Sequence, residues 1–228
     1  MTYRGNQRES RDRFLATYDA AEASSYDSWV SAMSSADHDA CVADLRPCVD
    51  FRDDMAVLDA GSGTGALCLA LVRIAGLRIT ALEPCAAMTD LLKSKPELKS
   101  IRTVRGFCDH AEDQSHFGAD SFDLIASRLL ANCLFDPLAA FRNWHHWLRP
   151  GGTLVVMDGL FDRSAWSGKW DGMVDTLPLS ACRTTATVPY LLEQIGFRID
   201  SVGPMSNTNA LSSTRTQRYI VVATKTVG

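Results

Sequence analysis

The residue types and spacing that suggest chemistry form a glycine-rich loop with an acid before it and another after it. Gly61, Gly63 and Gly65 alternate just after Asp59. Because glycine has no Cβ, the backbone can turn sharply here and let a ligand touch the main chain. Glu83 follows 24 residues after Asp59, and a carboxylate at that place can accept hydrogen bonds from two ribose hydroxyls. This combination indicates a ligand that contains a nucleoside.

These residues follow segments that we predict to be strands. The run 55–60 is short and apolar, with charges before it and glycines after it, as is typical of a strand buried on both faces. Further strands are predicted at 78–83, 101–105, 122–126 and 153–157, with helices from the glycines through Ala75, after Pro84 and from Asp136. Strands that alternate with helices predict an α/β fold, a mostly parallel sheet with helices on both faces. Ligands of such sheets bind at the carboxyl ends of the strands, which here are Asp59, Glu83, Asp109 and Ser127.

Both ends of the chain depart from this alternation. The first fifty residues show apolar positions three and four apart, which predicts a helical preface. After a final helix at 188–195, two predicted strands lack a helix between them, so we expect an antiparallel hairpin at one edge of the sheet. We therefore predict one domain with four parts: a helical cap at 1–52, a core at 53–158, an insertion at 159–187, and a final helix with the edge hairpin at 188–228.

Composition excludes several classes of protein. Of the 228 residues, 46% are hydrophobic and 22% charged, and the formal net charge is −4, which argues against a partner held by nucleic-acid phosphates. No apolar run approaches the length of a membrane span, and no secretory signal follows the N-terminus, so the cytosol is the expected compartment. The seven cysteines are odd in number and contain no Cys-x-x-Cys, so we expect reduced core thiols. The histidines lack partners at ligand spacing, and we expect no metal.

The glycine loop alone leaves the ligand open, because Gly61-x-Gly63-x-x-Ala66 also fits a dinucleotide-binding loop. The segments that accompany the glycine loop narrow the choice of ligand. The chain resembles the class I S-adenosylmethionine-dependent methyltransferases through the segments Val57–Gly65, Ala81–Pro84, Ser121–Ile125 and Leu148–Leu154. The resemblance covers residues 55 to 225 and implies a Rossmann-like, doubly wound sheet with S-adenosylmethionine as the cofactor.

The resemblance also implies individual roles. The glycine loop would hold the methionine portion, Glu83 the ribose hydroxyls and Asp109 the adenine amino group. The implied cofactor contacts are Asp59, Gly61, Ser62, Gly63, Thr64, Gly65, Glu83, Pro84, Met88, Cys108, Asp109, His110, Ser127 and, from an N-terminal aromatic that closes over the cofactor, Tyr26. Two alternatives stay open: Asp59 orders the loop only, and Asp109 is a turn acid without a ligand.

The insertion lies where this family builds its acceptor pocket, so Trp166 and Trp170 are candidate substrate contacts, although tryptophans four apart also fit a short packing helix. Arg128 could hold an acceptor carboxylate or phosphate, or form a surface salt bridge. The candidate catalytic residues are Asp158, Asp171 and Tyr18, with Asp175 as a further possible base.

We expect methyl transfer to a small-molecule acceptor, with no nucleic acid or membrane as partner. A second hypothesis keeps the cofactor but cyclises its methionine moiety to an azetidine-2-carboxylate-type product, with release of methylthioadenosine. A non-catalytic binding module and an NAD-dependent oxidoreductase are the remaining alternatives. The sequence does not predict the oligomeric state.

Overall fold

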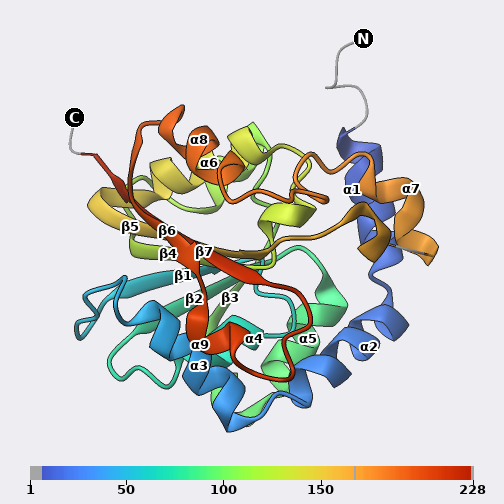
Figure 1. Cartoon of the computed structure of the whole chain (residues 1–228), viewed down its shortest axis with the longest axis horizontal. Coiled ribbons are helices and arrows are strands. Elements are labelled where there is room, and N and C mark those ends of the chain that lie inside the picture. The colour runs from blue at the N-terminus through green and yellow to red at the C-terminus, as the bar shows by residue number, and fades with distance from the viewer. Residues whose placement is uncertain (1–6, 167, 227–228) are drawn as a thin grey trace.

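A seven-stranded sheet forms the centre of the computed structural model, which describes residues 7–166 and 168–226 (Figure 1). Its strands are β1 (Ala56–Ala60), β2 (Arg78–Glu83), β3 (Arg102–Arg105), β4 (Phe122–Arg128), β5 (Leu148–Gly159), β6 (Phe197–Pro204) and β7 (Arg218–Lys225), in the spatial order β3-β2-β1-β4-β5-β7-β6. The first five pair in parallel, and β7 pairs antiparallel with both β5 and β6. The predicted Rossmann-like sheet with an antiparallel pair at one edge is confirmed.

Helices cover both faces of this sheet. They are α1 (Gln7–Thr17), α2 (Ala20–Ser31), α3 (Ser35–Leu45), α4 (Ala66–Leu71), α5 (Ala86–Ser94), α6 (Pro137–Trp147), α7 (Asp171–Val174), α8 (Thr187–Glu193) and α9 (Ser206–Asn209). Figure 1 shows α6 and α8 on one face and α3, α4, α5 and α9 on the other, with α1, α2 and α7 beside one end of the strands. None of the helices in the described part of the chain has the length and hydropathy that a bilayer crossing requires.

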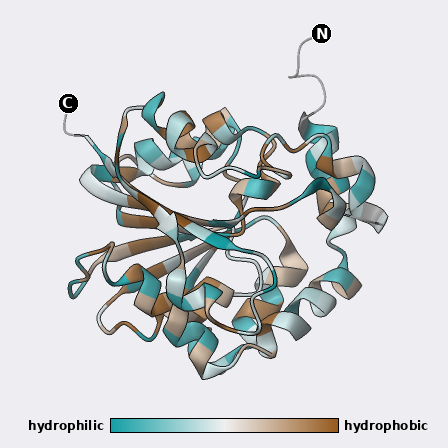
Figure 2. Cartoon of the chain, viewed as in Figure 1, coloured by the Kyte–Doolittle hydropathy of each residue, from teal (hydrophilic) through white to brown (hydrophobic). Residues whose placement is uncertain are grey.

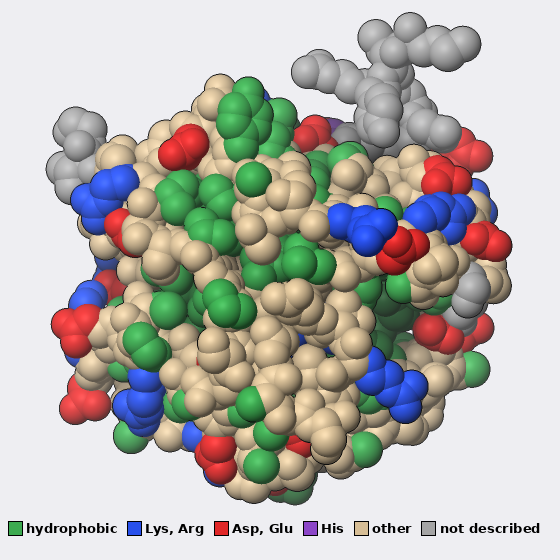
Figure 3. Space-filling model, in the orientation of Figure 1, with side chains coloured by type: hydrophobic (Ala, Val, Ile, Leu, Met, Phe, Trp, Pro, Cys, Tyr) green, Lys and Arg blue, Asp and Glu red, His purple; other side chains and the backbone are tan. Residues whose placement is uncertain are grey.

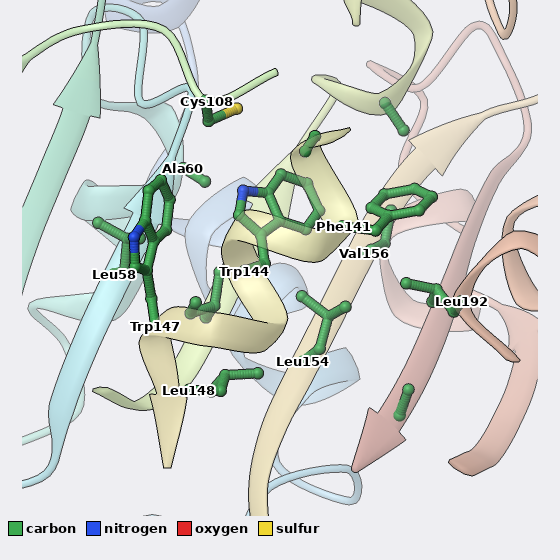
Figure 4. Close-up of a cluster of buried hydrophobic side chains, with 14 of the residues drawn as sticks. Leu58, Ala60, Cys108, Phe141, Trp144, Trp147, Leu148, Leu154, Val156 and Leu192 are labelled. Carbon is green, nitrogen blue, oxygen red and sulfur yellow. The ribbon is translucent and has the colours of Figure 1, made fainter. Parts of the chain in front are cut away.

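Two hydrophobic clusters occupy the two faces because successive strand residues point to opposite sides. Leu58 and Val156 belong to one cluster, whereas their neighbours Val57 and Val155 belong to the other. Figure 2 shows hydrophobic residues concentrated in the central strands, while the surrounding helices carry both hydrophobic and hydrophilic residues. Figure 4 shows Phe141 and Trp144 of α6 near Leu154 and Val156 of β5, with Trp147 on the side of Leu58 of β1. These three aromatic side chains are fully buried, which fixes α6 and the loop before it against the sheet.

The structure corrects three details of the predicted elements. The helix after the glycines was expected to reach Ala75, but α4 ends at Leu71. The reason is that Arg73 and Ile74 donate to carbonyls only three residues back, so the last turn tightens. The Ser/Thr/Asn-rich turn before β7 contains α9, whose backbone amides at Asn207 and Thr208 donate to the buried carboxylate of Asp44.

The third correction concerns β5, which begins at Leu148, five residues before the predicted start. Leu148 pairs with Phe122, and an irregularity between Phe122 and Leu124 absorbs the register shift before regular pairing resumes at Thr153. The proline and the glycines at 150–152 lie inside this irregular part of the strand, which is a place that such residues favour.

Candidate functional site

A cavity of about 360 Å³ lies at the carboxyl ends of the parallel strands. Figure 3 shows a hollow on the right side of the molecule with hydrophobic side chains inside it. Of the predicted site residues, those that line the cavity are Tyr18, Tyr26, Gly61, Gly63, Glu83, Pro84, Met88, Cys108, Asp109, Arg128, Trp166 and Trp170. Segments from the cap, the core and the insertion therefore meet around one space.

The glycine loop forms one wall in a conformation that requires glycine. Gly61, Gly63 and Gly65 have φ values of 68°, 53° and 101°, in the left-handed region that side chains disfavour. A Cβ at Gly61 would lie 2.6 Å from the side chain of Leu130, whereas one at Gly63 would meet nothing closer than Tyr26 at 3.5 Å. The main chain at Gly63 thus faces the cavity under the ring of Tyr26.

Glu83 holds this loop in place from the end of β2. Its Oε2 accepts from the backbone N–H of Gly63 and its Oε1 from that of Cys85, both at 2.9 Å. Burial raises the pKa of Glu83 to about 7, although both hydrogen bonds act in the opposite direction. Each carboxylate oxygen can accept a further hydrogen bond, so Glu83 can order the loop and hold ribose hydroxyls at the same time.

Asp59 lies behind the loop, outside the set of cavity-lining residues. Its carboxylate accepts from the thiol of Cys68 at 3.1 Å, and burial raises its pKa to about 7. In the described part of the chain no backbone amide of the loop donates to the Asp59 side chain. Its predicted contact with the cofactor stays a prediction.

Five further predicted cofactor contacts are not among the residues that line the cavity. The hydroxyls of Ser62, Thr64 and Ser127 are buried without a hydrogen-bond partner among the described residues, while Gly65 lies against the side chains of Leu92 in α5 and of Leu98 in the turn that follows α5. His110 caps the turn that follows it, since its Nδ1 accepts from Glu112 at 3.3 Å. These residues shape the wall without lining it.

Arg11 is a residue of the site that the sequence analysis missed. Its Nη2 lies 2.6 Å from both Asp109 Oδ1 and Asp113 Oδ2, and its guanidinium lies 4.5 Å from the centre of the Phe107 ring. The other oxygen of Asp109 accepts from the backbone N–H of Phe135 at 2.7 Å. Burial raises the pKa of Asp109, and the charge of Arg11 counteracts this rise. Asp109 therefore ties α1 to the core at the wall where the adenine contact was predicted.

We expect Arg11→Met to lower the free energy of unfolding by about 1.5–3 kcal/mol, because it leaves buried carboxylates without their charged donor. Urea unfolding of both proteins at pH 7 measures this difference. The matched control is Arg8→Met, since Arg8 is exposed on the same helix. Equal stability of the two variants would contradict the assignment of Arg11 as the residue that anchors α1.

Aromatic side chains from the cap and the insertion cover the cavity. Tyr18 of the cap contacts Trp170, with ring centroids 4.9 Å apart, and Trp166 lies 6.2 Å from Trp170. The indole Nε1 of Trp166 donates to Ser180 O at 2.9 Å. The tryptophans therefore pack against each other and line the cavity as well. Burial raises the pKa of the Tyr18 hydroxyl well above its ordinary value, so this group stays protonated at neutral pH.

The acids considered as bases lie away from the cavity lining. Asp158 is buried, and its oxygens accept from Asn132 Nδ2 at 2.6 Å, Asn132 N at 3.1 Å and Gly159 N at 2.7 Å. Asp171 and Asp175 are exposed and pair with Arg163, each at 3.1 Å. Asp158 holds Asn132, which does line the cavity. Among residues 7–166 and 168–226, no group of three or more His, Cys, Asp or Glu side chains is arranged to hold a metal ion.

Comparison with known proteins identifies the fold that carries this site. Residues 58–156 match a family described as a methyltransferase domain. This part of the chain is similar to methyltransferase domains. The matched segment contains the glycine loop, Glu83, Asp109 and Arg128, and the predicted family and its cofactor, S-adenosylmethionine, are confirmed.

Individual relatives are distant from this methyltransferase domain in sequence. The Escherichia coli (strain K12) protein YafE, described as uncharacterized, is 34% identical over 83 residues, which covers 35% of this chain and 38% of YafE. A SAM-dependent methyltransferase from Aquifex aeolicus has a TM-score of 0.65 at 16% identity, over 91% of this chain and 99% of that one. Geranyl diphosphate C-methyltransferase from Streptomyces coelicolor A3(2), crystallised with S-adenosyl-L-homocysteine, has a TM-score of 0.60 at 14% identity, over 82% and 76%. These structures share the fold.

The cavity of the methyltransferase domain fits its cofactor on two independent observations. The backbone at Gly63 is open toward the cavity, and the buried carboxylate of Glu83 lies beside it with acceptor capacity left. An adenosyl group requires both a close backbone approach and an acceptor for ribose hydroxyls.

Proposed function

We propose that this chain transfers the methyl group of S-adenosylmethionine to a small-molecule acceptor by direct displacement. The observation that carries the proposal is the composition of the cavity wall, which contains Gly63 and Glu83 for the cofactor and Arg128, Phe161 and Trp166 for an acceptor. A cavity of about 360 Å³ between the cap and the insertion favours a small acceptor over a macromolecule.

In this proposal the chain acts mainly by positioning. S-adenosylmethionine supplies an activated methyl group, because its sulfonium is an excellent leaving group. Glu83 and the main chain at Gly61 and Gly63 would fix the adenosyl end, with Met88 and Cys108 beside the ring. Tyr18, Tyr26 and Trp170 would exclude water and lie near the positive charge, which aromatic faces stabilise. Alignment of two bound molecules supplies a large part of the rate enhancement in such reactions.

In this proposal the residues predicted as bases would not take a proton from the acceptor directly. Asp158 would act through Asn132, which it holds at the cavity wall by two hydrogen bonds. Burial raises the pKa of Asp158, against the hydrogen bonds from Asn132 and Gly159. Asp171 would help to stabilise the fold of the insertion through its ion pair with Arg163. Tyr18, as a protonated hydroxyl that lines the cavity, would donate a hydrogen bond to a bound ligand.

The same observations favour a second candidate, cyclisation of the methionine moiety with release of methylthioadenosine. This reaction needs no acceptor and only a bent cofactor in a closed pocket. The grip of Gly63 and Glu83 on the adenosyl end would serve this reaction equally well. The methionine nitrogen would lose a proton, attack its own γ-carbon and displace the sulfur as methylthioadenosine, so this reaction would need a base just as an acceptor with a proton to lose would, and Asp158, Asp171 and Asp175 do not line the cavity in the described part of the chain.

One experiment separates the two candidates. The purified protein is incubated with S-adenosylmethionine alone, and again with a fractionated pool of small metabolites, and the nucleoside product is identified by mass. Methyl transfer predicts S-adenosylhomocysteine that depends on a fraction of the pool. Methylthioadenosine formed without the pool would replace the first proposal by the second, and turnover in neither condition would contradict both.

A further inference from the structure

In the part of the chain that the structure describes, two arginines near the cavity lack an ion-pair partner: Arg128, which lines the cavity, and Arg218, which lies behind the cavity-lining Phe161. Arg128 ends β4 and lines the cavity, and its guanidinium lies 5.4 Å from the centre of the Trp29 ring. Arg218 begins β7, which is antiparallel to β5, so both arginines are at the same edge of the sheet. Within residues 7–166 and 168–226, neither guanidinium has a carboxylate within 4 Å or a hydrogen-bond acceptor.

Arg218 is the more unusual of the two because its charge is largely enclosed. Among the residues that the structure describes, none accepts a hydrogen bond from its buried Nη1, and a Cβ at Gly159 would lie 2.5 Å from that atom. The guanidinium thus folds over the end of β5, 5.5 Å from the centre of the cavity-lining Phe161 ring. A buried cationic donor with an unsatisfied N–H is costly unless something pairs with it.

The nearby groups leave this positive charge uncompensated. Asp158 is the carboxylate that favours the charge on Arg218, but its oxygens already accept hydrogen bonds from Asn132 and Gly159. Burial, together with the positive charge of Arg128, lowers the pKa of Arg218 to about 10. The hydroxyl of Tyr26 is close enough for both arginines to act on its pKa, which burial raises.

We propose that Arg128 and Arg218 bind an oxyanion, so that the acceptor is a small molecule with a carboxylate or phosphate group next to an apolar or aromatic body. Guanidinium groups bind both oxyanions through paired charge-assisted hydrogen bonds. Phe161, Trp166 and Trp29 supply the apolar surface next to the two charges. The inference rests on the proposed methyl transfer, since it names the class of acceptor.

A carboxylate could also come from the methionine part of the cofactor, because Tyr26 lies over Gly63. The position of Arg218 favours the acceptor instead. β7 pairs with β5, on the far side of β4 from the glycine loop and Glu83. The test therefore includes ligands that separate the two sources.

The test uses Arg128→Gln and Arg218→Gln, with Arg142→Gln as the control on an exposed arginine of α6. Calorimetry measures the affinity of each protein for S-adenosylhomocysteine and for methylthioadenosine, which lacks the carboxylate. Benzoate and phenyl phosphate are then titrated into the S-adenosylhomocysteine complexes. We expect both cofactor products to bind within about twofold of the wild type in all variants. We expect one of the two anions to bind the wild type and the control, and to lose about tenfold or more in the Arg128 and Arg218 variants.

Three outcomes would overturn the proposal. A tenfold loss of S-adenosylhomocysteine affinity with unchanged methylthioadenosine affinity would assign the arginines to the cofactor's own carboxylate. Equal anion binding in wild type and variants, or no anion binding by the wild-type complex, would remove the oxyanion site. Arg218→Lys, which keeps the charge, should restore part of the anion affinity if the loss comes from the missing cation and not from local misfolding. Failure of the wild type to bind S-adenosylhomocysteine at all would instead count against the proposed function.

Discussion

Replacement of Glu83 by alanine is expected to weaken binding of S-adenosylhomocysteine by about 1–3 kcal/mol, roughly a five- to 150-fold loss of affinity. The variant removes the acceptor proposed for the ribose hydroxyls, and it also removes the carboxylate to which Gly63 N and Cys85 N donate. Calorimetric titration at pH 8 measures the change, since the pKa of Glu83 is raised to about 7 by burial and the carboxylate is ionised there.

A comparison of ligands separates these two effects of Glu83. The 2′-deoxy analogue of S-adenosylhomocysteine lacks one of the hydroxyls that the carboxylate would accept from. If Glu83 contacts the ribose, Glu83→Ala should cost clearly less affinity for the analogue than for the parent compound. Equal losses would mean that Glu83 acts only by ordering the loop. Glu193→Ala, on an exposed position of α8, is the control and should leave both affinities unchanged.

The main parts of the fold could be predicted from the sequence because local patterns and tertiary packing agree there. The strand predicted at 78–83 has the observed bounds of β2, since Gly76 shortly before it and Pro84 directly after it interrupt regular structure. The glycine spacing at 61, 63 and 65 predicted a sharp turn, and all three have positive φ. These features depend on residues adjacent in sequence, which is why one sequence was enough.

The site is predictable only in part, because some of it depends on contacts between distant segments. Arg11 lies 98 residues from Asp109, and nothing near Arg11 in the sequence indicates a buried partner. Arg218 is similar, since its burial at the end of β5 follows from the antiparallel return of β7. Asp158 was a candidate base because it is one of the acids at the predicted acceptor insertion. Only the structure shows that Asn132 and Gly159 occupy its oxygens. A strand-end position indicates nearness to a cavity but not the direction of a side chain.

The second large effect is a loss of stability as the pH rises, caused by Asp59 and Glu83. Burial raises the pKa of both to about 7, from ordinary values of 3.8 and 4.5. Between pH 4 and 7 the unfolded chain therefore releases these two protons while the folded chain keeps them. Because the folded state then binds more protons, its stability falls across this window and levels off above about pH 7. Each group contributes a loss of about 3–4 kcal/mol in order of magnitude.

Other groups titrate in the same window, so the effect is measured as a difference between proteins. Raised pKa values of Asp109 and Asp158 act in the same direction, whereas lowered pKa values of His38 and His145 act in the opposite one. Urea unfolding of the wild type and of Asp59→Asn, at pH 4.5 and pH 8 without ligand, cancels these shared contributions. We expect the variant to gain stability relative to the wild type by about 2–4 kcal/mol between the two pH values.

Asp39→Asn serves as the control, since Asp39 is an exposed carboxylate on α3, and its difference from the wild type should change little with pH. A pH-independent difference between Asp59→Asn and the wild type would show that Asp59 is ionised in the folded state throughout this range. If the variant instead gains stability relative to the wild type as the pH rises, the buried carboxylate of Asp59 lowers the free energy of unfolding of the wild type at neutral pH. This loss of stability is explained if a cation near the loop, such as the sulfonium of the bound cofactor, favours the ionised carboxylate. Addition of S-adenosylmethionine should then flatten the pH dependence of the wild type more than that of Asp59→Asn.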